Sequence, residues 1–242
     1  MTRDIFGWHS PALNKHMEIV SYGHFGFALL LLPTAAADYL EYERFLLIDV
    51  LKPFIEAGKI KVFSINSINS ESWLNSKMWP RHKAMRHVQF NEYVFEEVVP
   101  HIRRVTSDQT PIITCGASFG ALHSMNLFLK RPDLINGVIA MSGVYDLHDY
   151  TKGYYDEDTY FNSPMSYLPD LQDEWYLSKI RSGKIHVLSG SGDYESPDSS
   201  RSFSALLSHK NIPHELDIWG YDMTHDWPTW RSMLPYVIGS KF

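Results

Sequence analysis

Apolar residues occur along this chain in two alternating patterns. One is a short continuous run, as in Phe27–Pro33, and the other is a segment whose apolar residues recur every three or four positions, as between Phe45 and Ile55. Continuous runs are typical of strands covered on both faces of a parallel sheet, and the second spacing is typical of amphipathic helices. Their alternation predicts an α/β fold with a mostly parallel central sheet, helices on both faces and no large separate lid domain.

The same patterns give approximate boundaries for the elements. We expect residues 1–16 to form an irregular arm, and residues 144–171, which lack periodicity, to shape the wall of a pocket. The predicted strands are 17–23, 26–33, 59–66, 111–116, 137–143, 184–190 and 214–220. The predicted helices are 45–58, 81–103, 121–130, 174–181, 197–210 and a last one from about 228.

Length and composition fit one domain. The 242 residues, 44% hydrophobic and 21% charged, are enough to bury the core of a single domain over residues 1–242. The net charge of -6 comes from interspersed acids and bases with no basic stripe, and the aromatic residues are not interleaved with Lys and Arg. Nucleic acid is therefore not an expected partner.

The single cysteine and the absence of long apolar runs bear on location. Cys115 has no second cysteine to pair with, and it lies in an apolar strand, where a buried thiol is inert. The longest apolar run, Phe27–Pro33, is far shorter than a membrane span, and the first residues contain no apolar signal segment. We expect a cytoplasmic protein without a membrane partner.

The stretch Gly116-Ala-Ser-Phe-Gly120 has the form G-x-S-x-G. It joins a predicted strand to a predicted helix, which is the context of a nucleophile elbow, where the two glycines let strand and helix approach each other. An ordinary Gly-Ser-Gly turn is the alternative interpretation. The flanking strand and helix favour the elbow and predict Ser118 as a catalytic nucleophile.

A serine nucleophile needs a base, and an elbow of this kind is followed along the chain by an acid and then by a histidine. Of the 12 histidines, only His225 follows the last predicted strand. His186 lies within a strand, His209 and His214 flank a connection at the opposite edge of the sheet, and His123 is in the elbow helix. The order of elements therefore predicts His225 as the base.

Three carboxylates are candidates for the acid. Asp193 and Glu195 follow the penultimate strand, and Asp146 follows the strand before it. All three positions are compatible with the expected edge of the sheet, and each residue could instead be a solvated loop carboxylate or a turn cap. Spacing alone leaves the choice open.

An oxyanion hole needs backbone N–H groups that face the developing negative charge. One is expected from Phe119, directly after the nucleophile, and the second from the loop Thr34–Asp38, at about Ala36. The chain has no H-E-x-x-H, paired-cysteine or Rossmann glycine pattern, so neither a metal nor an organic cofactor is expected.

Together with the elbow, several segments resemble the "Putative esterase" family of α/β-hydrolases, which includes S-formylglutathione hydrolase (esterase D), feruloyl esterase domains and the mycobacterial mycolyltransferases. The resemblance extends over almost the whole chain. Its other carriers are Trp8–Leu13, Pro33-Thr34 followed by Glu41–Glu43, Asn66–Trp73 and His225–Arg231.

The resemblance implies Ser118 as nucleophile and His225 as base. For the acid, some members carry a Gly-x-x-Asp pattern that Gly190–Asp193 fits, whereas the mycolyltransferases use a glutamate that Glu195 resembles. Glu195 is preferred on this basis, with Asp193 as the alternative. Relatives are glycine-rich after Pro33-Thr34, where this chain has Ala35–Ala37, and a positive φ is costly for alanine, so the resemblance leaves the second oxyanion donor open.

The expected activity is hydrolysis of small-molecule carboxylic esters through a Ser-His-acid triad and an acyl-enzyme. An acyltransferase using the same triad, and a non-catalytic binding protein that retains the fold, are the alternatives. Aromatic candidates for a substrate pocket are Trp73 and Trp227, with Tyr145 and Trp230 beside them, although aromatic residues more often pack in cores and walls. The sequence leaves open the acyl and alcohol groups and whether the chain forms a homo-oligomer.

Overall fold

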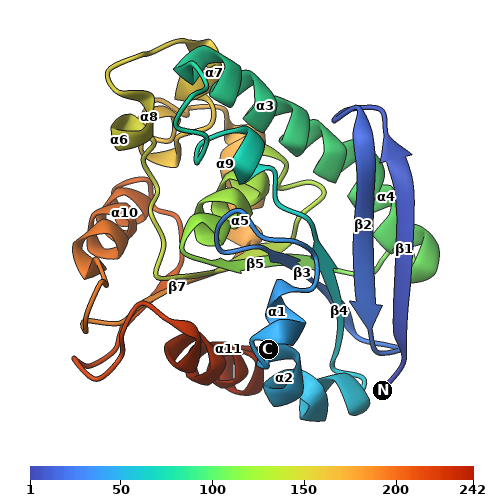
Figure 1. Ribbon diagram of the computed structural model, residues 1–242. Helices are drawn as coiled ribbons and strands as arrows, with labels where there is room; N and C mark the ends of the chain where they lie inside the picture. Colours follow the sequence, from blue (N-terminus) through green and yellow to red (C-terminus); the bar gives the residue numbers. More distant parts are fainter.

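One eight-stranded sheet runs through the molecule, in the order β1-β2-β4-β3-β5-β6-β7-β8 (Figure 1). The structure is a computed structural model that describes all of residues 1–242. The strands from β4 to β8 in this order are parallel, whereas β1 and β2 are antiparallel to their neighbours at one edge. The strands are β1 (Arg3–Ser10), β2 (Lys15–Tyr22), β3 (Phe27–Leu32), β4 (Ile60–Ile65), β5 (Ile112–Ala117), β6 (Gly137–Met141), β7 (Lys184–Ser189) and β8 (Glu215–Ile218).

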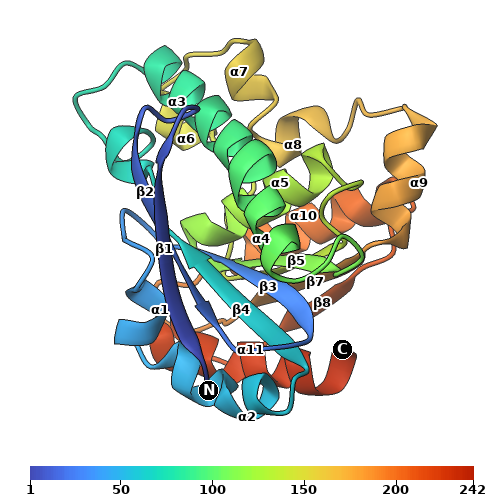
Figure 2. The same cartoon turned by 90° about the vertical axis from the view of Figure 1, so that its right-hand side faces the viewer.

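Helices cover both faces of this sheet, as Figure 2 shows. On one face lie α1 (Glu41–Arg44), α2 (Leu47–Glu56) and α11 (Trp227–Lys241). The helices elsewhere are α3 (Pro80–Tyr93), α4 (Val99–Val105), α5 (Phe119–Lys130), α6 (His148–Thr151), α7 (Glu157–Tyr160), α8 (Pro164–Tyr167), α9 (Glu174–Ser182) and α10 (Pro197–His209). The predicted α/β-hydrolase architecture is therefore confirmed. None of the helices combines the length and the apolar character needed to cross a bilayer.

The leucines of β3 show why a continuous apolar run marks a central strand. Leu29 and Leu31 belong to the core shared with α2 and α11, and Leu30 and Leu32 belong to the core shared with α5 and α10. All four are fully buried, and each contributes roughly 1.5–3 kcal/mol through removal of apolar surface from water. This packing fixes the end of β3, from which the loop after Leu32 departs toward the elbow.

The prediction of an irregular arm over residues 1–16 is wrong. Residues 3–10 form β1, which pairs along its whole length with β2, from Arg3 opposite Tyr22 to Ser10 opposite Lys15. Most of β1 is exposed, so the strand is held by backbone hydrogen bonds and leaves almost no buried apolar pattern in the sequence.

Two other segments differ in detail from the predicted elements. The long helix predicted over 81–103 is divided into α3, a π-helical turn at Val94–Val98 and α4. Pro100 lacks an N–H and cannot continue a regular helix, and the wider turn directly before α4 accommodates it. The segment 144–171 contains α6, α7 and α8, each of only four residues, which is too short to produce a periodic pattern.

Candidate active site

Ser118 lies in the turn between β5 and α5, with backbone angles of φ 55° and ψ -123°. This is a strained conformation for a residue with a side chain. The two flanking glycines have steric reasons to be there, because a Cβ on Gly116 would lie 2.3 Å from the Gly120 carbonyl carbon and one on Gly120 would lie 2.4 Å from the Leu32 oxygen. The sequence thus folds into an elbow that exposes the serine hydroxyl at the carboxyl edge of the sheet.

His225 lies between Ser118 and Glu195. Its Nε2 is 3.0 Å from Ser118 Oγ, and its Nδ1 is 3.5 Å from Glu195 Oε2. If the serine hydroxyl donates to Nε2, the neutral ring carries its proton on Nδ1, which faces the carboxylate. The second distance is at the long end of the hydrogen-bond range.

The Glu195 side chain is inaccessible to solvent and is held by serines from two strand ends. Ser142 Oγ donates to Oε1 at 2.5 Å, and Ser189 Oγ donates to Oε2 at 3.2 Å. Burial alone would raise the pKa of Glu195, but the contacts with His225 and Ser142 outweigh it and hold the pKa below its usual value. The carboxylate is therefore charged at neutral pH.

The other two carboxylate candidates lie in different surroundings. Asp193 is exposed, and it reaches His225 only through its main chain, whose carbonyl accepts from the His225 N–H at 3.0 Å. The side chain of Asp146 accepts from the backbone N–H of His148, the first residue of α6. Of the three, only Glu195 has a carboxylate in contact with the imidazole.

The predicted oxyanion donor is already engaged in this structure. The Phe119 N–H donates to the Thr34 carbonyl oxygen at 3.1 Å, so it is not free to bind a second acceptor, contrary to the simple expectation. The Glu41 carboxylate holds the loop in this position, because it accepts from the Thr34 N–H at 2.8 Å and from the Thr34 hydroxyl at 2.7 Å. Ala36 is exposed, and its N–H forms no hydrogen bond.

A buried chain of hydrogen bonds runs from α3 and α5 to the same loop. The Trp73 indole N–H can only donate, and it donates to Nδ1 of His87 at 3.0 Å. His87 must then donate from Nε2 to His123 Nδ1 (3.0 Å), and His123 from Nε2 to Asn69 Oδ1 (2.9 Å). Asn69 donates in turn to the Ala35 carbonyl at 3.2 Å. The donor of each hydrogen bond is therefore fixed, and the chain of bonds ends at the Ala35 carbonyl, next to Thr34.

The predicted substrate contacts of Trp73 and Trp227 are not supported by this structure. Trp73 is 2% exposed, and its indole N–H is bonded to His87. Trp227 is 7% exposed and stacks on Phe45 with ring centroids 4.5 Å apart. Tyr145 and Trp230 are likewise buried. These aromatics are packing residues, which is what large rings near strand ends most often are.

The sequence did not predict the residues that hold the Glu195 carboxylate or those that hold the loop Thr34–Asp38. Ser142 and Ser189 lie at or just after the ends of β6 and β7, and their position at strand ends was the available signal. Nothing in the spacing of His87 and Asn69 indicates that they meet, because they come from separate elements.

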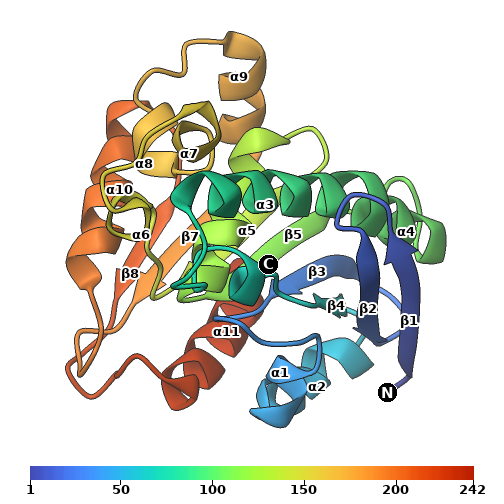
Figure 3. The ribbon, with the colours of Figure 1, turned by 45° about the horizontal axis from the view of Figure 1, so that its top comes forward.

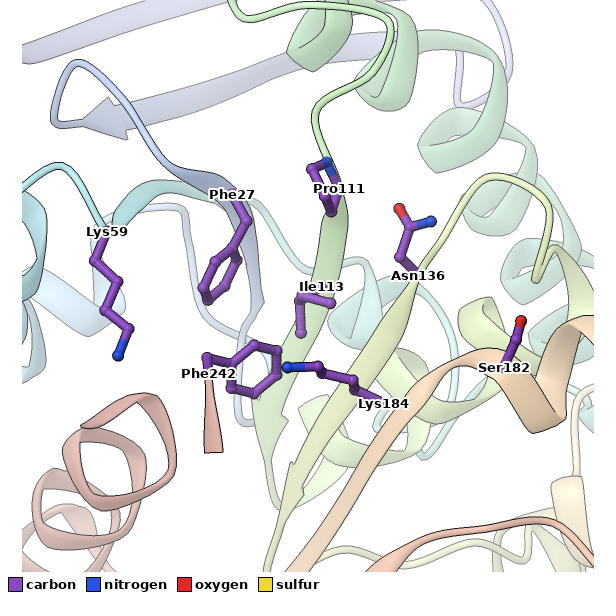
Figure 4. Close-up of a pocket in the computed structure, with 8 residues that line it drawn as sticks. All are labelled: Phe27, Lys59, Pro111, Ile113, Asn136, Ser182, Lys184 and Phe242. Carbon is purple, nitrogen blue, oxygen red and sulfur yellow. The ribbon is translucent and has the colours of Figure 1, made fainter. Parts of the chain in front are cut away.

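A hollow of about 370 Å³ lies at the amino ends of the parallel strands (Figure 4). Ser118 follows the opposite, carboxyl end of β5. Phe27 and Ile113 come from the first residues of β3 and β5, and the last residue of the chain, Phe242, covers them. In open α/β sheets ligands bind at the carboxyl ends, so this hollow is not the catalytic pocket.

Comparisons with known proteins bear on the family and the fold. The profile of the family described as "Putative esterase" matches residues 69–238. A ferulic acid esterase superposes with a TM-score of 0.72 at 18% identity, over 98% of each chain. S-formylglutathione hydrolase (FrmB) from Staphylococcus aureus gives 0.69 at 17% identity, over 98% of this chain and 97% of that one.

MPT51 (FbpC1) from Mycobacterium tuberculosis gives a TM-score of 0.74 at 14% identity, over 99% of this chain and 97% of that one. Identities this low show a shared fold and do not transfer an activity. No curated protein sequence matches the chain.

Proposed function

The chain belongs to the "Putative esterase" family, and from that premise we propose that it hydrolyses small-molecule carboxylic esters, with Ser118 as nucleophile, His225 as general base and Glu195 as the acid. The observation that carries the proposal is the position of His225, whose two ring nitrogens face the serine hydroxyl and the buried carboxylate. This arrangement is the one that nucleophilic catalysis by serine requires.

The reaction follows from these contacts. Ser118 Oγ attacks the ester carbonyl carbon while its proton passes to His225 Nε2, and the negative Glu195 stabilises the resulting imidazolium. The tetrahedral intermediate then expels the alcohol, which takes the proton from His225. Water attacks the acyl-enzyme carbonyl in the same way while His225 accepts its proton. Collapse of the second intermediate breaks the bond to Ser118 Oγ, which takes that proton back from His225 as the acid product leaves.

Replacement of the nucleophile tests this proposal. We expect Ser118→Ala to abolish both hydrolysis of p-nitrophenyl acetate and labelling by a fluorophosphonate, whereas Ser202→Ala, at an exposed position on α10, leaves both unchanged. Full turnover by Ser118→Ala would contradict the assignment. Product analysis with an added alcohol separates hydrolysis from acyl transfer, because transfer would yield a new ester.

A further inference from the structure

We propose that the oxyanion hole is closed in this structure by the Thr34 carbonyl, and that it opens when the peptide between Thr34 and Ala35 turns over, which makes the Ala35 N–H the second donor. The inference rests on the proposed function. In this proposal Ala35 takes the place of Ala36 as the second donor, and Glu41 and Asn69 are positioning residues that hold the loop.

The closed state follows from the hydrogen bond between the Phe119 N–H and the Thr34 oxygen. A backbone N–H has one proton, and an oxyanion that approached it here would meet the negative end of the Thr34 carbonyl dipole. Stabilisation of the intermediate requires donors at this position. The carbonyl oxygen must therefore leave before the site can act.

The structure holds the loop firmly on both sides of one peptide. Glu41 fixes the Thr34 N–H and hydroxyl, and Asn69 fixes the Ala35 carbonyl. Between these points the Ala35 N–H forms no hydrogen bond, so the turn breaks only the bond from Phe119 to Thr34. In a trans peptide the C=O and N–H point in opposite directions, so the same turn brings the Ala35 N–H to the side that the oxygen leaves.

The turn has a predictable conformational cost. It rotates ψ of Thr34 and φ of Ala35 in opposite senses, and it leaves the peptides held by Glu41 and Asn69 in place. Ala35 is at negative φ, and a half-turn about that bond brings φ to a positive value. Positive φ is unfavourable for alanine and not for glycine, which explains why the closed state is the one seen here.

Substitution of Ala35 by glycine should therefore favour the open state. We expect Ala35→Gly to raise the rate constant of fluorophosphonate labelling about fivefold to tenfold, the equivalent of the usual alanine penalty. The matched control is Ala37→Gly, which adds the same flexibility two residues later and should change the rate less than about twofold. Equal effects of the two variants, or no acceleration by Ala35→Gly in folded protein, would overturn the proposal.

A crystal structure of the phosphonylated enzyme gives a second, independent readout. We expect the phosphonyl oxygen to accept from the N–H groups of Phe119 and Ala35, with the Thr34 oxygen turned away. An adduct in which Thr34 still accepts from Phe119, or in which Ala36 is the donor, would contradict the inference. Absence of any labelling in the wild-type protein would instead contradict the proposed function itself.

A different observation points to the charge of the substrate. A second hollow of about 370 Å³ lies between the loop that leads into α3 and helix α6, which are neighbours in Figure 3. We propose that it binds a carboxylate carried by the ester substrate. This inference also rests on the proposed function.

Three lysines line this hollow, Lys77, Lys83 and Lys152, and no acidic residue does. None of the three lysines forms an ion pair within the chain. Lys83 is 5% exposed, and its ammonium group has one partner, the Trp73 carbonyl at 3.3 Å. Burial and the nearby charge of Lys152 lower the pKa of Lys83. A bound anion would relieve both penalties.

One residue in the wall of this hollow packs against the elbow. Tyr150 lines it and packs edge-on against the ring of Phe119, the residue after the nucleophile, with centroids 5.0 Å apart. Tyr150 is thus the residue through which the wall of the lysine-lined hollow contacts the neighbour of Ser118.

Two esters of similar length test this assignment, 4-nitrophenyl valerate and the mono-4-nitrophenyl ester of glutaric acid. We expect kcat/KM to favour the anionic ester by about tenfold or more, as one desolvated charge pair would give. Lys83→Met should bring the ratio of kcat/KM for the anionic ester to kcat/KM for the neutral ester close to one, whereas Lys52→Met on α2 should leave that ratio unchanged. Equal rates for the two esters would overturn the inference, whereas hydrolysis of neither would count against the proposed function.

Discussion

The two halves of the candidate site are held by different means. On one side, His225 already faces Ser118 and Glu195, and buried serines fix the carboxylate. On the other side, the Phe119 N–H is occupied by Thr34, and one peptide must turn before the site can bind an oxyanion. Side-chain groups are thus in place before substrate binds, whereas the backbone donors are not, and catalysis requires both.

The largest expected effect tests the side that is already in place. Glu195→Gln keeps the size of the side chain and removes the charge that stabilises the imidazolium, so kcat should fall roughly 10³- to 10⁴-fold. Asp193→Asn is the matched control and should alter kcat little, because its side chain is exposed. Steady-state kinetics on p-nitrophenyl acetate distinguish them, and equal small losses would remove Glu195 from the triad.

The second prediction concerns the stability of the oxyanion side. Burial lowers the pKa of His123 to about 3, and burial and the neighbouring His123 lower that of His87 well below its usual value. The unfolded chain takes up protons on both below about pH 6.5 while the folded chain does not, so stability falls as the pH drops from about 6.5 toward 3.

The free energy of unfolding should fall by about 1.4 kcal/mol per pH unit for each of the two histidines in the middle of this range. Urea unfolding at pH 7 and pH 5 measures it, and His123→Gln should reduce the slope. A free energy of unfolding that stays constant between these pH values would show that the pair is not buried as the structure has it.

The smallest expected effect concerns Asn69, which holds the loop through its hydrogen bond to the Ala35 carbonyl. Asn69→Ala removes the donor to the Ala35 carbonyl and lets the neighbouring peptide move, so kcat should fall about tenfold with little change in KM, because substrate binding does not use this contact. Asn75→Ala, in the same connection, is the control. A loss that appears only in KM would place Asn69 in substrate binding and not in positioning of the loop.

The sequence predicts the fold class and the positions of the chemical groups better than their orientations. Ser118 follows β5, which has a continuous buried apolar run, and His225 comes after β8, the edge strand in which polar and apolar residues alternate. Both lie beyond the carboxyl ends of parallel strands, so their meeting at one edge follows from the topology. The choice between Asp193 and Glu195 depends on the turn at Tyr194, whose φ of 63° sends the two side chains to different surroundings. No composition or spacing rule predicts such a turn for a tyrosine.

The sequence does not predict the direction of the Thr34 carbonyl either, because it depends on two side chains that meet the loop only in the folded chain: Glu41, seven residues away, and Asn69, which follows another strand. Strand β1 was missed for another reason. Its hydrogen bonds to β2 are independent of side-chain type, and its exposed residues carry no apolar pattern.

The series of hydrogen bonds from Trp73 to the Ala35 carbonyl also makes the Trp73 indole a spectroscopic probe of the loop. Hydrogen bonds in a row polarise one another, so a change at the loop alters the electron density around the indole proton at the far end. The chain contains seven tryptophans, and their indole protons resonate apart from the backbone amides in a nitrogen-correlated NMR spectrum. The Trp73 signal, assigned by its loss in Trp73→Phe, would follow the loop during catalysis without any label near Ser118.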